Sequence, residues 1–176
     1  LGRTWYSPRG ASVLCSVILV GRSVLVENPA DRDSCWSKAD AHARMSAFLT
    51  HVTAVAACDA IRQSTDITPA IKWPNDLRHG GRKLGGILIE SRALTNGRQA
   101  WVVGIGINCL QHRGHFPREL RETATSLELA ASHAIDRLVV IRSLLQSLDE
   151  WQLAWNHDDM SRVHSAWLDY AEPLDR

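Results

Sequence analysis

The strongest constraint on the fold is a pair of apolar segments in the middle of the chain, joined by a short turn. Residues 83–91 and 99–108 are rich in aliphatic residues. Thr95-Asn96-Gly97, between them, has the composition of a tight hairpin turn of the primed type. The centre of the chain is therefore predicted to be an antiparallel β-meander, with glycines inside its strands.

Further strands and turns are expected around this meander. Residues 13–20 form a short run of β-branched and aliphatic residues, typical of a buried strand. Residues 70–73 form a shorter strand, which Pro74-Asn75-Asp76 must end. His79-Gly80-Gly81 predicts a tight turn.

Three-residue and four-residue spacings of apolar side chains predict the helices. The first is an amphipathic helix of about six turns through Met45 and Ile61, with one face against a sheet, behind the capping-box spacing of Ser37 and Asp40. The second runs from Leu138 to Trp151 with Asp136 as its N-cap, and a shorter one runs from Val163 to Tyr170.

These elements predict the fold class. Residues 21–36 and 109–125 are polar and are expected to be irregular. The prediction is an α+β fold, with a mixed, largely antiparallel sheet and helices packed on it. A chain of 176 residues is long enough to bury a core without a metal or disulfides.

Composition excludes several classes of function. A formal net charge of +1 does not indicate a dedicated nucleic-acid binder. The longest apolar run, residues 13–20, is far shorter than the roughly 18 residues that cross a bilayer. The four cysteines form no CxxC pair, which predicts reduced, mostly buried thiols in a cytoplasmic protein. The eight histidines show no metal-ligand spacing, so no structural metal is expected.

Lys83 opens an apolar strand and is followed closely by Gly85 and Gly86. Glycines inside a strand often mark the close approach of a ligand to the backbone. A lysine at the mouth of such a groove suits a carboxylate or a phosphate. The alternative is a solvated lysine at a strand end, with glycines that ease the twist of the sheet.

Other polar and small residues occur where a plain core strand would avoid them. Asn75 and Asp76 form a turn, or present an amide and a carboxylate beside the lysine. Gly104 and Gly106 lack the third glycine of a dinucleotide-binding fingerprint and instead leave room for a bulky ligand, with Asn108 at the exit.

Trp5, near the start of the chain, has two readings. An aromatic ring can stack on a base, which is typically worth about 1–3 kcal/mol. An indole packed in the core explains it equally well on local grounds, since the chain has seven tryptophans.

Together these clusters resemble the catalytic domain of the biotin–protein ligases. The resemblance covers most of the chain, from Gly2 to about Leu174. It rests on four motifs in the family's order: Gly-Arg-Thr-Trp-Tyr-Ser-Pro from residue 2, Lys-Trp-Pro-Asn-Asp from residue 72, Lys-Leu-Gly-Gly-Ile-Leu from residue 83 and Gly-Ile-Gly-Ile-Asn from residue 104. One motif alone would be weak evidence, whereas four in order are specific.

The resemblance implies a two-step reaction. Biotin and ATP give biotinyl-5′-AMP and pyrophosphate, with Mg²⁺ on the phosphates, and a lysine of a biotin-carrier domain then displaces AMP. Lys83 matches the lysine beside the biotin carboxylate and the α-phosphate, and Asp76 matches the aspartate near the incoming lysine. Trp5 matches the residue that covers the adenine, and Arg3 matches the last arginine of the loop that folds over the adenylate.

The remaining matches concern the two substrates. Asn75 and Asn108 match amides near the nucleotide. Four glycines match those that leave space for biotin in the family: Gly85, Gly86, Gly104 and Gly106. No residue is assigned to a metal.

The chain also departs from the family pattern at both ends. In the family, two strands and a helix that contact the ureido ring of biotin precede Gly2-Arg3, and a small β-barrel domain follows about Leu174. Residues 1–174 are therefore expected to be part of a catalytic domain truncated at both ends. We expect the chain alone to be weakly active or inactive.

Two alternatives to a biotin–protein ligase stay open. One is a lipoate–protein ligase or octanoyltransferase, which shares the fold type, and the other is a non-catalytic biotin-binding remnant. The implied partner is the biotin-carrier domain of a biotin-dependent carboxylase, and a homodimer paired through sheet edges is compatible with the family. Some members repress transcription through an N-terminal helix-turn-helix, which this sequence does not contain.

Overall fold

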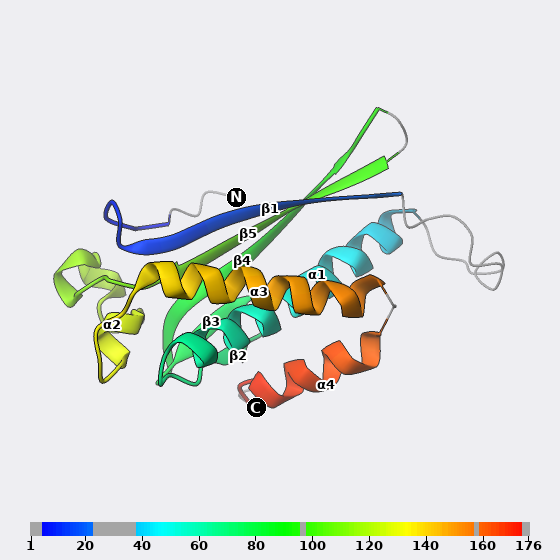
Figure 1. Ribbon diagram of the computed structural model, residues 1–176. Helices are drawn as coiled ribbons and strands as arrows, with labels where there is room; N and C mark the ends of the chain where they lie inside the picture. Colours follow the sequence, from blue (N-terminus) through cyan, green and yellow to red (C-terminus); the bar gives the residue numbers. More distant parts are fainter. Residues whose placement is uncertain (1–4, 23–37, 96–97, 157–158, 174–176) are drawn as a thin grey trace.

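The computed structural model describes residues 5–22, 38–95, 98–156 and 159–173 (Figure 1). Its strands are β1 (Ser12–Arg22), β2 (Ala70–Lys72), β3 (Asp76–His79), β4 (Arg82–Ala93) and β5 (Arg98–Asn108). Its helices are α1 (Lys38–Ser64), α2 (Leu127–Ala130), α3 (Arg137–Asn156) and α4 (Met160–Tyr170), with short 3-10 turns at Arg113–His115 and Arg118–Leu120.

The strands form one sheet in the order β1-β5-β4-β3-β2, and every neighbouring pair is antiparallel. Within the described part of the chain, parallel pairing is confined to two isolated bridges, Ile71 with Ala171 and Lys83 with Ala124. The predicted α+β class with a largely antiparallel sheet is confirmed.

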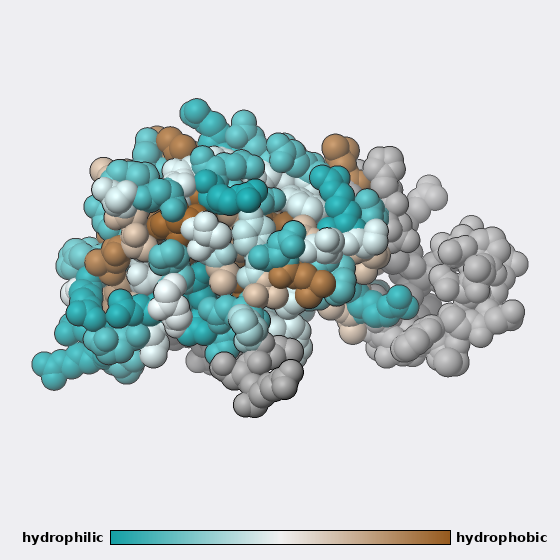
Figure 2. All heavy atoms as spheres, turned by 90° about the horizontal axis from the view of Figure 1, so that it is seen from below, coloured by the Kyte–Doolittle hydropathy of each residue, from teal (hydrophilic) through white to brown (hydrophobic). Residues whose placement is uncertain are grey.

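Helices α1 and α3 lie together against one face of the sheet, and α4 packs beside α1 (Figure 1). The core between these layers combines aliphatic residues of the sheet, such as Ile87 and Ile105, with residues of α1 and α3 such as Val55 and Leu144. Figure 2, seen from below Figure 1, shows mostly hydrophilic residues with small apolar patches. The helices thus bury apolar side chains inward and present polar ones outward.

Helix α1 is buried more completely than an amphipathic helix with one inner face. Residues 54–58 are five consecutive positions with no measurable exposure. Three of them are alanines, whose small side chains let the sheet, α3 and α4 approach from different sides. The predicted helix with one face against the sheet is confirmed, and α3 and α4 cover further sides of its middle.

Asp59 on α1 joins the three large helices. One carboxylate oxygen accepts a hydrogen bond from Trp151 Nε1 on α3 at 2.8 Å, and the other accepts one from Tyr170 Oη on α4 at 2.6 Å. Burial, followed by the hydrogen bond to Asp59, raises the pKa of the Tyr170 hydroxyl well above its ordinary value. These partly buried contacts fix the positions of α3 and α4 on α1.

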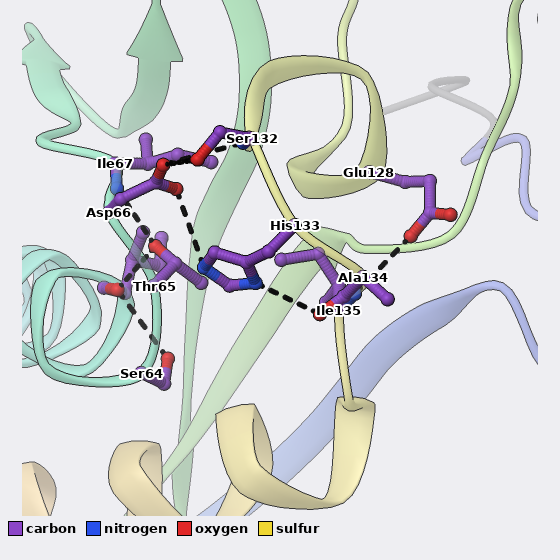
Figure 3. A network of polar contacts seen from close by, with 10 residues as sticks. Ser64, Thr65, Asp66, Ile67, Glu128, Ser132, His133, Ala134 and Ile135 are labelled. Atoms are coloured by element: carbon purple, nitrogen blue, oxygen red, sulfur yellow. Dashed lines mark hydrogen bonds and ion pairs between the residues drawn. The ribbon is translucent and has the colours of Figure 1, made fainter.

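A second polar cluster joins the end of α1 to the segment before α3 (Figure 3). Asp66 accepts hydrogen bonds from the hydroxyl of Ser132 and from its backbone N–H, the latter at 3.3 Å. His133 Nε2 lies 3.5 Å from the same carboxylate, and His133 Nδ1 lies 2.9 Å from the carbonyl of Ala134. The hydrogen bond from Ser132 lowers the pKa of the Asp66 carboxyl.

Most predicted elements are confirmed, with small shifts at their ends. Asp136 caps α3, as predicted, because its carboxylate accepts the N–H of Leu138 at 2.8 Å. Strand β3 and helix α2 were not predicted, since each has only four residues and only one of them is buried, Leu77 and Leu127 respectively. The hairpin turn at Asn96-Gly97 and the cap at Ser37 lie outside the described residues.

The opposite face of the sheet has no helix on it in the described part of the chain (Figure 1). Large apolar side chains are exposed there, including Leu14 at 62%, Ile18 at 66% and Leu88 at 55%. Residues opposite one another on antiparallel strands point to the same side. Three rows therefore cross this face: Leu14–Gly106–Gly86, Ser16–Gly104–Leu88 and Ile18–Val102–Glu90.

The turn between β3 and β4 gives a testable stability prediction. Gly80 and Gly81 have φ values of +54° and +73°, and a Cβ on either would meet nothing within 4 Å. Gly80→Ala should therefore cost about 1–2 kcal/mol through backbone strain alone, measured by urea denaturation. Gly80→Asn should cost less because asparagine tolerates this conformation. An alanine variant as stable as the wild type would contradict this reading.

Candidate functional site

The open face of the sheet places Lys83 beside Asp76 and Gly86. Lys83 Nζ donates a hydrogen bond to Asp76 Oδ1, across the adjacent strands β4 and β3. A Cβ added to Gly86 would lie 3.6 Å from both Asp76 Oδ1 and Lys83 Cε. The ammonium and the carboxylate therefore sit at the edge of a surface with no side chain at Gly86. Both groups are partly exposed, at 42% and 32%, and so accessible to a ligand.

Asn75 holds the backbone that carries Asp76 against β4. Its side-chain amide donates to the carbonyl of Ile87 at 2.7 Å, and its own carbonyl accepts the N–H of Ile87 at 2.9 Å. Asn75 thus extends the pairing of β3 with β4 past the end of the strand. Its described hydrogen bonds fix the position of Asp76.

Trp5 lies on the same open face, directly over β5. A Cβ added to Gly106 would come within 2.8 Å of the six-membered part of the Trp5 ring. Gly106 and Gly86 are paired across β5 and β4, so the indole and Lys83 lie over neighbouring strands on one face. Trp5 is 38% exposed, which agrees with a surface-lying ring better than with one packed in the core.

The other two predicted glycines differ from each other. Gly104 is the next open position along β5, and a Cβ there would meet only Leu88 at ordinary distances of 3.4 Å and 3.6 Å. A Cβ on Gly85 would lie 2.5 Å from the carbonyl oxygen of Gly106 and 3.2 Å from the core residue Leu77. Close packing within the sheet therefore accounts for glycine at position 85 without a ligand.

Asn108 is 5% exposed, and both ends of its side-chain amide are bonded within the protein. Its Nδ2 donates to the carbonyl of Thr125 at 2.9 Å, and its Oδ1 accepts from Gln111 Nε2 at 3.0 Å. Gln111 has no measurable exposure, and sequence reasoning missed it because it sits in a polar stretch with no periodicity. Only the three-dimensional contacts single it out.

The remaining residues considered from the sequence are Arg3 and the four cysteines. Arg3 and Cys35 lie outside the described residues. The other three cysteines are free thiols, and Cys58 and Cys109 are buried as predicted. Burial raises the pKa of the Cys109 thiol to about 11, so it is a poor nucleophile at neutral pH.

Two other features of the described residues are distinct from this site. In the cluster of Figure 3, Ser132 donates to Asp66 and not to the ring of His133, so the serine is not activated as in a nucleophilic relay. An apolar hollow lined by Leu49, Val103 and their neighbours lies on the helix-covered face of the sheet, away from Lys83. No helix in the described ranges is long and apolar enough to span a membrane.

The chemistry available on the open face is that of anion binding beside an aromatic platform. A lysine ammonium can neutralise a carboxylate or a phosphate, and an indole can stack on a flat ring. A floor of small residues, Gly86, Gly104 and Gly106, lies between apolar side chains and admits a ligand close to the backbone.

Comparison with known proteins finds a matching family profile and similar curated proteins. Residues 34–108 match the profile of the Biotin/lipoate A/B protein ligase family. The chain is 32% identical over 171 residues to the bifunctional ligase/repressor BirA of Bacillus subtilis (strain 168), covering 97% of this chain and 47% of that protein. It is 33% identical over 132 residues to the biotin–[acetyl-CoA-carboxylase] ligase of Paracoccus denitrificans, covering 73% of this chain and 55% of that protein.

The fold comparison agrees. A biotin protein ligase from Aquifex aeolicus, solved in complex with biotin and ATP, superposes with a TM-score of 0.70 at 24% identity. The superposition covers 97% of this chain and 62% of that structure. The chain spans about half the length of the curated relatives described above. The motifs, the family profile and the curated relatives together assign residues 34–108 of this chain to the biotin/lipoate A/B protein ligase family.

Proposed function

We propose that this chain carries the adenylation site of a biotin–protein ligase. The reaction would join biotin to ATP and then pass the biotinyl group to a lysine of a carrier domain. One observation carries the proposal: Lys83 with its partner Asp76, and the Trp5 ring, lie over neighbouring strands on one glycine-floored face. The relative from Paracoccus denitrificans, which is named as a biotin ligase, supports biotin as the acyl substrate.

In the first step, a carboxylate oxygen of biotin would attack the α-phosphorus of ATP. A new phosphorus–oxygen bond forms, the bond from the α-phosphorus to the bridging oxygen breaks, and pyrophosphate leaves with that electron pair. Two anions must meet, so a cation between them lowers the barrier. Lys83 is positioned for this role because its ammonium projects beside Gly86 at the edge of the open floor.

Mg²⁺ would assist by neutralising charge on the phosphates of the nucleotide. Asp76 is the described carboxylate nearest Lys83, and it is already hydrogen-bonded to that ammonium. This contact does not fit a dedicated Mg²⁺ ligand, so we assign the ion to no residue and derive no step through it.

In the second step, the amine of the acceptor lysine would attack the carbonyl carbon of the mixed anhydride. The bond from that carbon to the phosphate oxygen breaks, and AMP leaves. The amine must be neutral to attack, so a nearby carboxylate that takes or orients its proton helps. Lys83 contacts Oδ1 of Asp76, and among the described residues Oδ2 has no hydrogen-bond partner, so it could accept a proton from an incoming amine.

The acyl substrate separates this proposal from its main alternative. The matched family includes lipoate as well as biotin ligases. With the purified chain, Mg²⁺ and ATP, we expect biotin to support slow exchange of labelled pyrophosphate into ATP and to raise the melting temperature, and lipoate to do neither. A preference for lipoate would make the chain a lipoate ligase relative. Stabilisation by biotin without exchange would identify a binding remnant.

The partner class follows from the same proposal. The acceptor is expected to be the biotin-carrier domain of a biotin-dependent carboxylase, and the compartment is expected to be the cytoplasm. Strand β1 is one edge of the described sheet, so pairing of two copies along β1 stays a prediction. Sedimentation velocity over a range of concentrations tests it.

A further inference from the structure

A buried chain of polar groups joins the Trp5 side of the site to the Lys83 side. We propose that Gln111, at the centre of this chain, is a positioning residue that holds the two sides in register. The inference deepens the proposed function, and its kinetic consequence rests on that function. The coupling of the Trp5 segment to the Lys83 backbone through Gln111 can be measured without catalysis.

The side-chain amide nitrogen of Gln111 donates two hydrogen bonds. Its Nε2 donates to Ser12 Oγ at 2.6 Å and to Asn108 Oδ1 at 3.0 Å. The residue has no measurable exposure, and neither Ser12 nor Asn108 exceeds 7%. Water therefore cannot readily replace these bonds, and loss of the amide would leave the buried Oδ1 of Asn108 without its described donor.

The first branch leads to Trp5. Ser12 Oγ also accepts a hydrogen bond from Ser7 Oγ at 2.8 Å. Ser7 lies two residues after Trp5, whose ring rests on Gly106. Gln111 therefore fixes the hydroxyl on which the Trp5 segment is anchored to the start of β1.

The second branch leads to the backbone of Lys83. Asn108 Nδ2 donates to the carbonyl of Thr125 at 2.9 Å. The N–H of Thr125 donates to the carbonyl of Lys83 at 2.8 Å, and the N–H of Lys83 donates to the carbonyl of Thr123 at 2.7 Å. Gln111 thus orients the amide that holds residues 123–125 against Lys83.

Hydrogen bonds of the backbone hold the loop that carries Gln111, so the position of its side chain is fixed. The backbone carbonyl of Gln111 accepts a hydrogen bond from Ser126 Oγ at 2.6 Å. The N–H groups of Cys109 and Leu110 donate to the carbonyl of Ala11 at 3.2 Å and 2.7 Å. These bonds do not involve the Gln111 side chain, so a side-chain substitution should loosen the two branches without unfolding the chain.

For the reaction, Gln111 matters because it fixes the position of the Trp5 ring relative to Lys83. Loss of the Gln111 amide would let the Trp5 ring and Lys83 shift relative to each other, and small misplacements of reacting groups are costly. For Gln111→Met, which keeps the length of the side chain and removes its donors, we expect kcat for pyrophosphate exchange to fall about tenfold or more. The KM for biotin should change much less, since methionine adds no group to the glycine floor.

The matched control removes another buried polar group. Ser147 on α3 is 1% exposed, and its hydroxyl has no hydrogen-bond partner among the described residues. Ser147→Ala should leave both kinetic constants within about twofold of wild type, because no bond is lost. Ser12→Ala is the selective variant, since it breaks the first branch and spares the contact between Gln111 and Asn108.

Amide hydrogen exchange followed by mass spectrometry measures the coupling directly. Gln111→Met should speed exchange about threefold or more in both segments 5–14 and 120–126, Ser12→Ala only in 5–14, and Ser147→Ala in neither. Unchanged hydrogen exchange in either segment of Gln111→Met overturns the inference. Faster hydrogen exchange with an unchanged kcat for pyrophosphate exchange also overturns it. A wild-type chain without pyrophosphate exchange would instead refute the proposed function, and the pattern of hydrogen exchange alone would then show whether Gln111 couples the two segments.

Discussion

Lys83→Ala is expected to lower biotin-dependent pyrophosphate exchange by about 10²–10³-fold, the cost typical of removing one preorganised stabilising group. The reason is that a biotin carboxylate and the α-phosphate of ATP repel each other, and Lys83 supplies the cation beside the glycine floor. Initial rates at saturating ATP, across a range of biotin concentrations, measure the effect. The loss should appear mainly in kcat.

Stability should not explain that loss. The Lys83–Asp76 pair is partly exposed, and such pairs typically contribute about 0–1 kcal/mol. Arg92→Ala removes an exposed cation further along the same strand, β4, and provides the control for a change of net charge. Lys83→Arg keeps the charge but not the compact ammonium, so we expect partial activity. Equal exchange in Lys83→Ala and Arg92→Ala would remove Lys83 from the mechanism.

Gly106→Ala is expected to weaken ATP binding by about tenfold, within the range that stacking on an aromatic ring typically contributes. The new methyl group would lie 2.8 Å from the Trp5 ring, which must move away from β5. Isothermal titration calorimetry with ATP measures the change. The fold should survive, because the group that moves is a partly exposed side chain and not the backbone.

Gly104→Ala is the matched contrast for this prediction. It places the same methyl group two residues away on the same face of β5, where only Leu88 lies within 4 Å. The ATP dissociation constant should therefore rise at least fivefold more in Gly106→Ala than in Gly104→Ala, if stacking is worth about 1 kcal/mol or more. Equal effects of the two variants would show that the Trp5 ring does not form part of the nucleotide site.

Candidate site residues could be predicted from the sequence where the residue type alone was unusual at its position. Lys83, Asp76 and Gly86 stood out because a lysine, a carboxylate and a glycine are unusual beside a core strand, and the structure brings them together. Trp5 could not be placed from its neighbours, since a core indole and a surface indole look alike in sequence. The close approach of the Trp5 ring to Gly106, 101 positions along the chain, places the ring on the open face of the sheet.

Long-range contacts also explain what sequence reasoning missed. Gln111 gains its significance from Ser12, a partner 99 residues away, and no local pattern predicts that contact. Gly85 looked like a residue that makes room for a ligand, whereas the carbonyl of Gly106 already occupies that space. Strand β3 was missed because Leu77 is its only buried residue, too few to show a two-residue period.

The most direct test of the account is biotin-dependent ATP–pyrophosphate exchange by the purified chain, with Lys83→Ala beside it. The account predicts slow exchange that requires biotin and disappears in Lys83→Ala, while circular dichroism shows both proteins folded. Exchange that is as fast in Lys83→Ala as in the wild-type chain would contradict an adenylation site on the open face of the sheet. A folded wild-type chain with no biotin-dependent exchange would contradict adenylation by this chain alone.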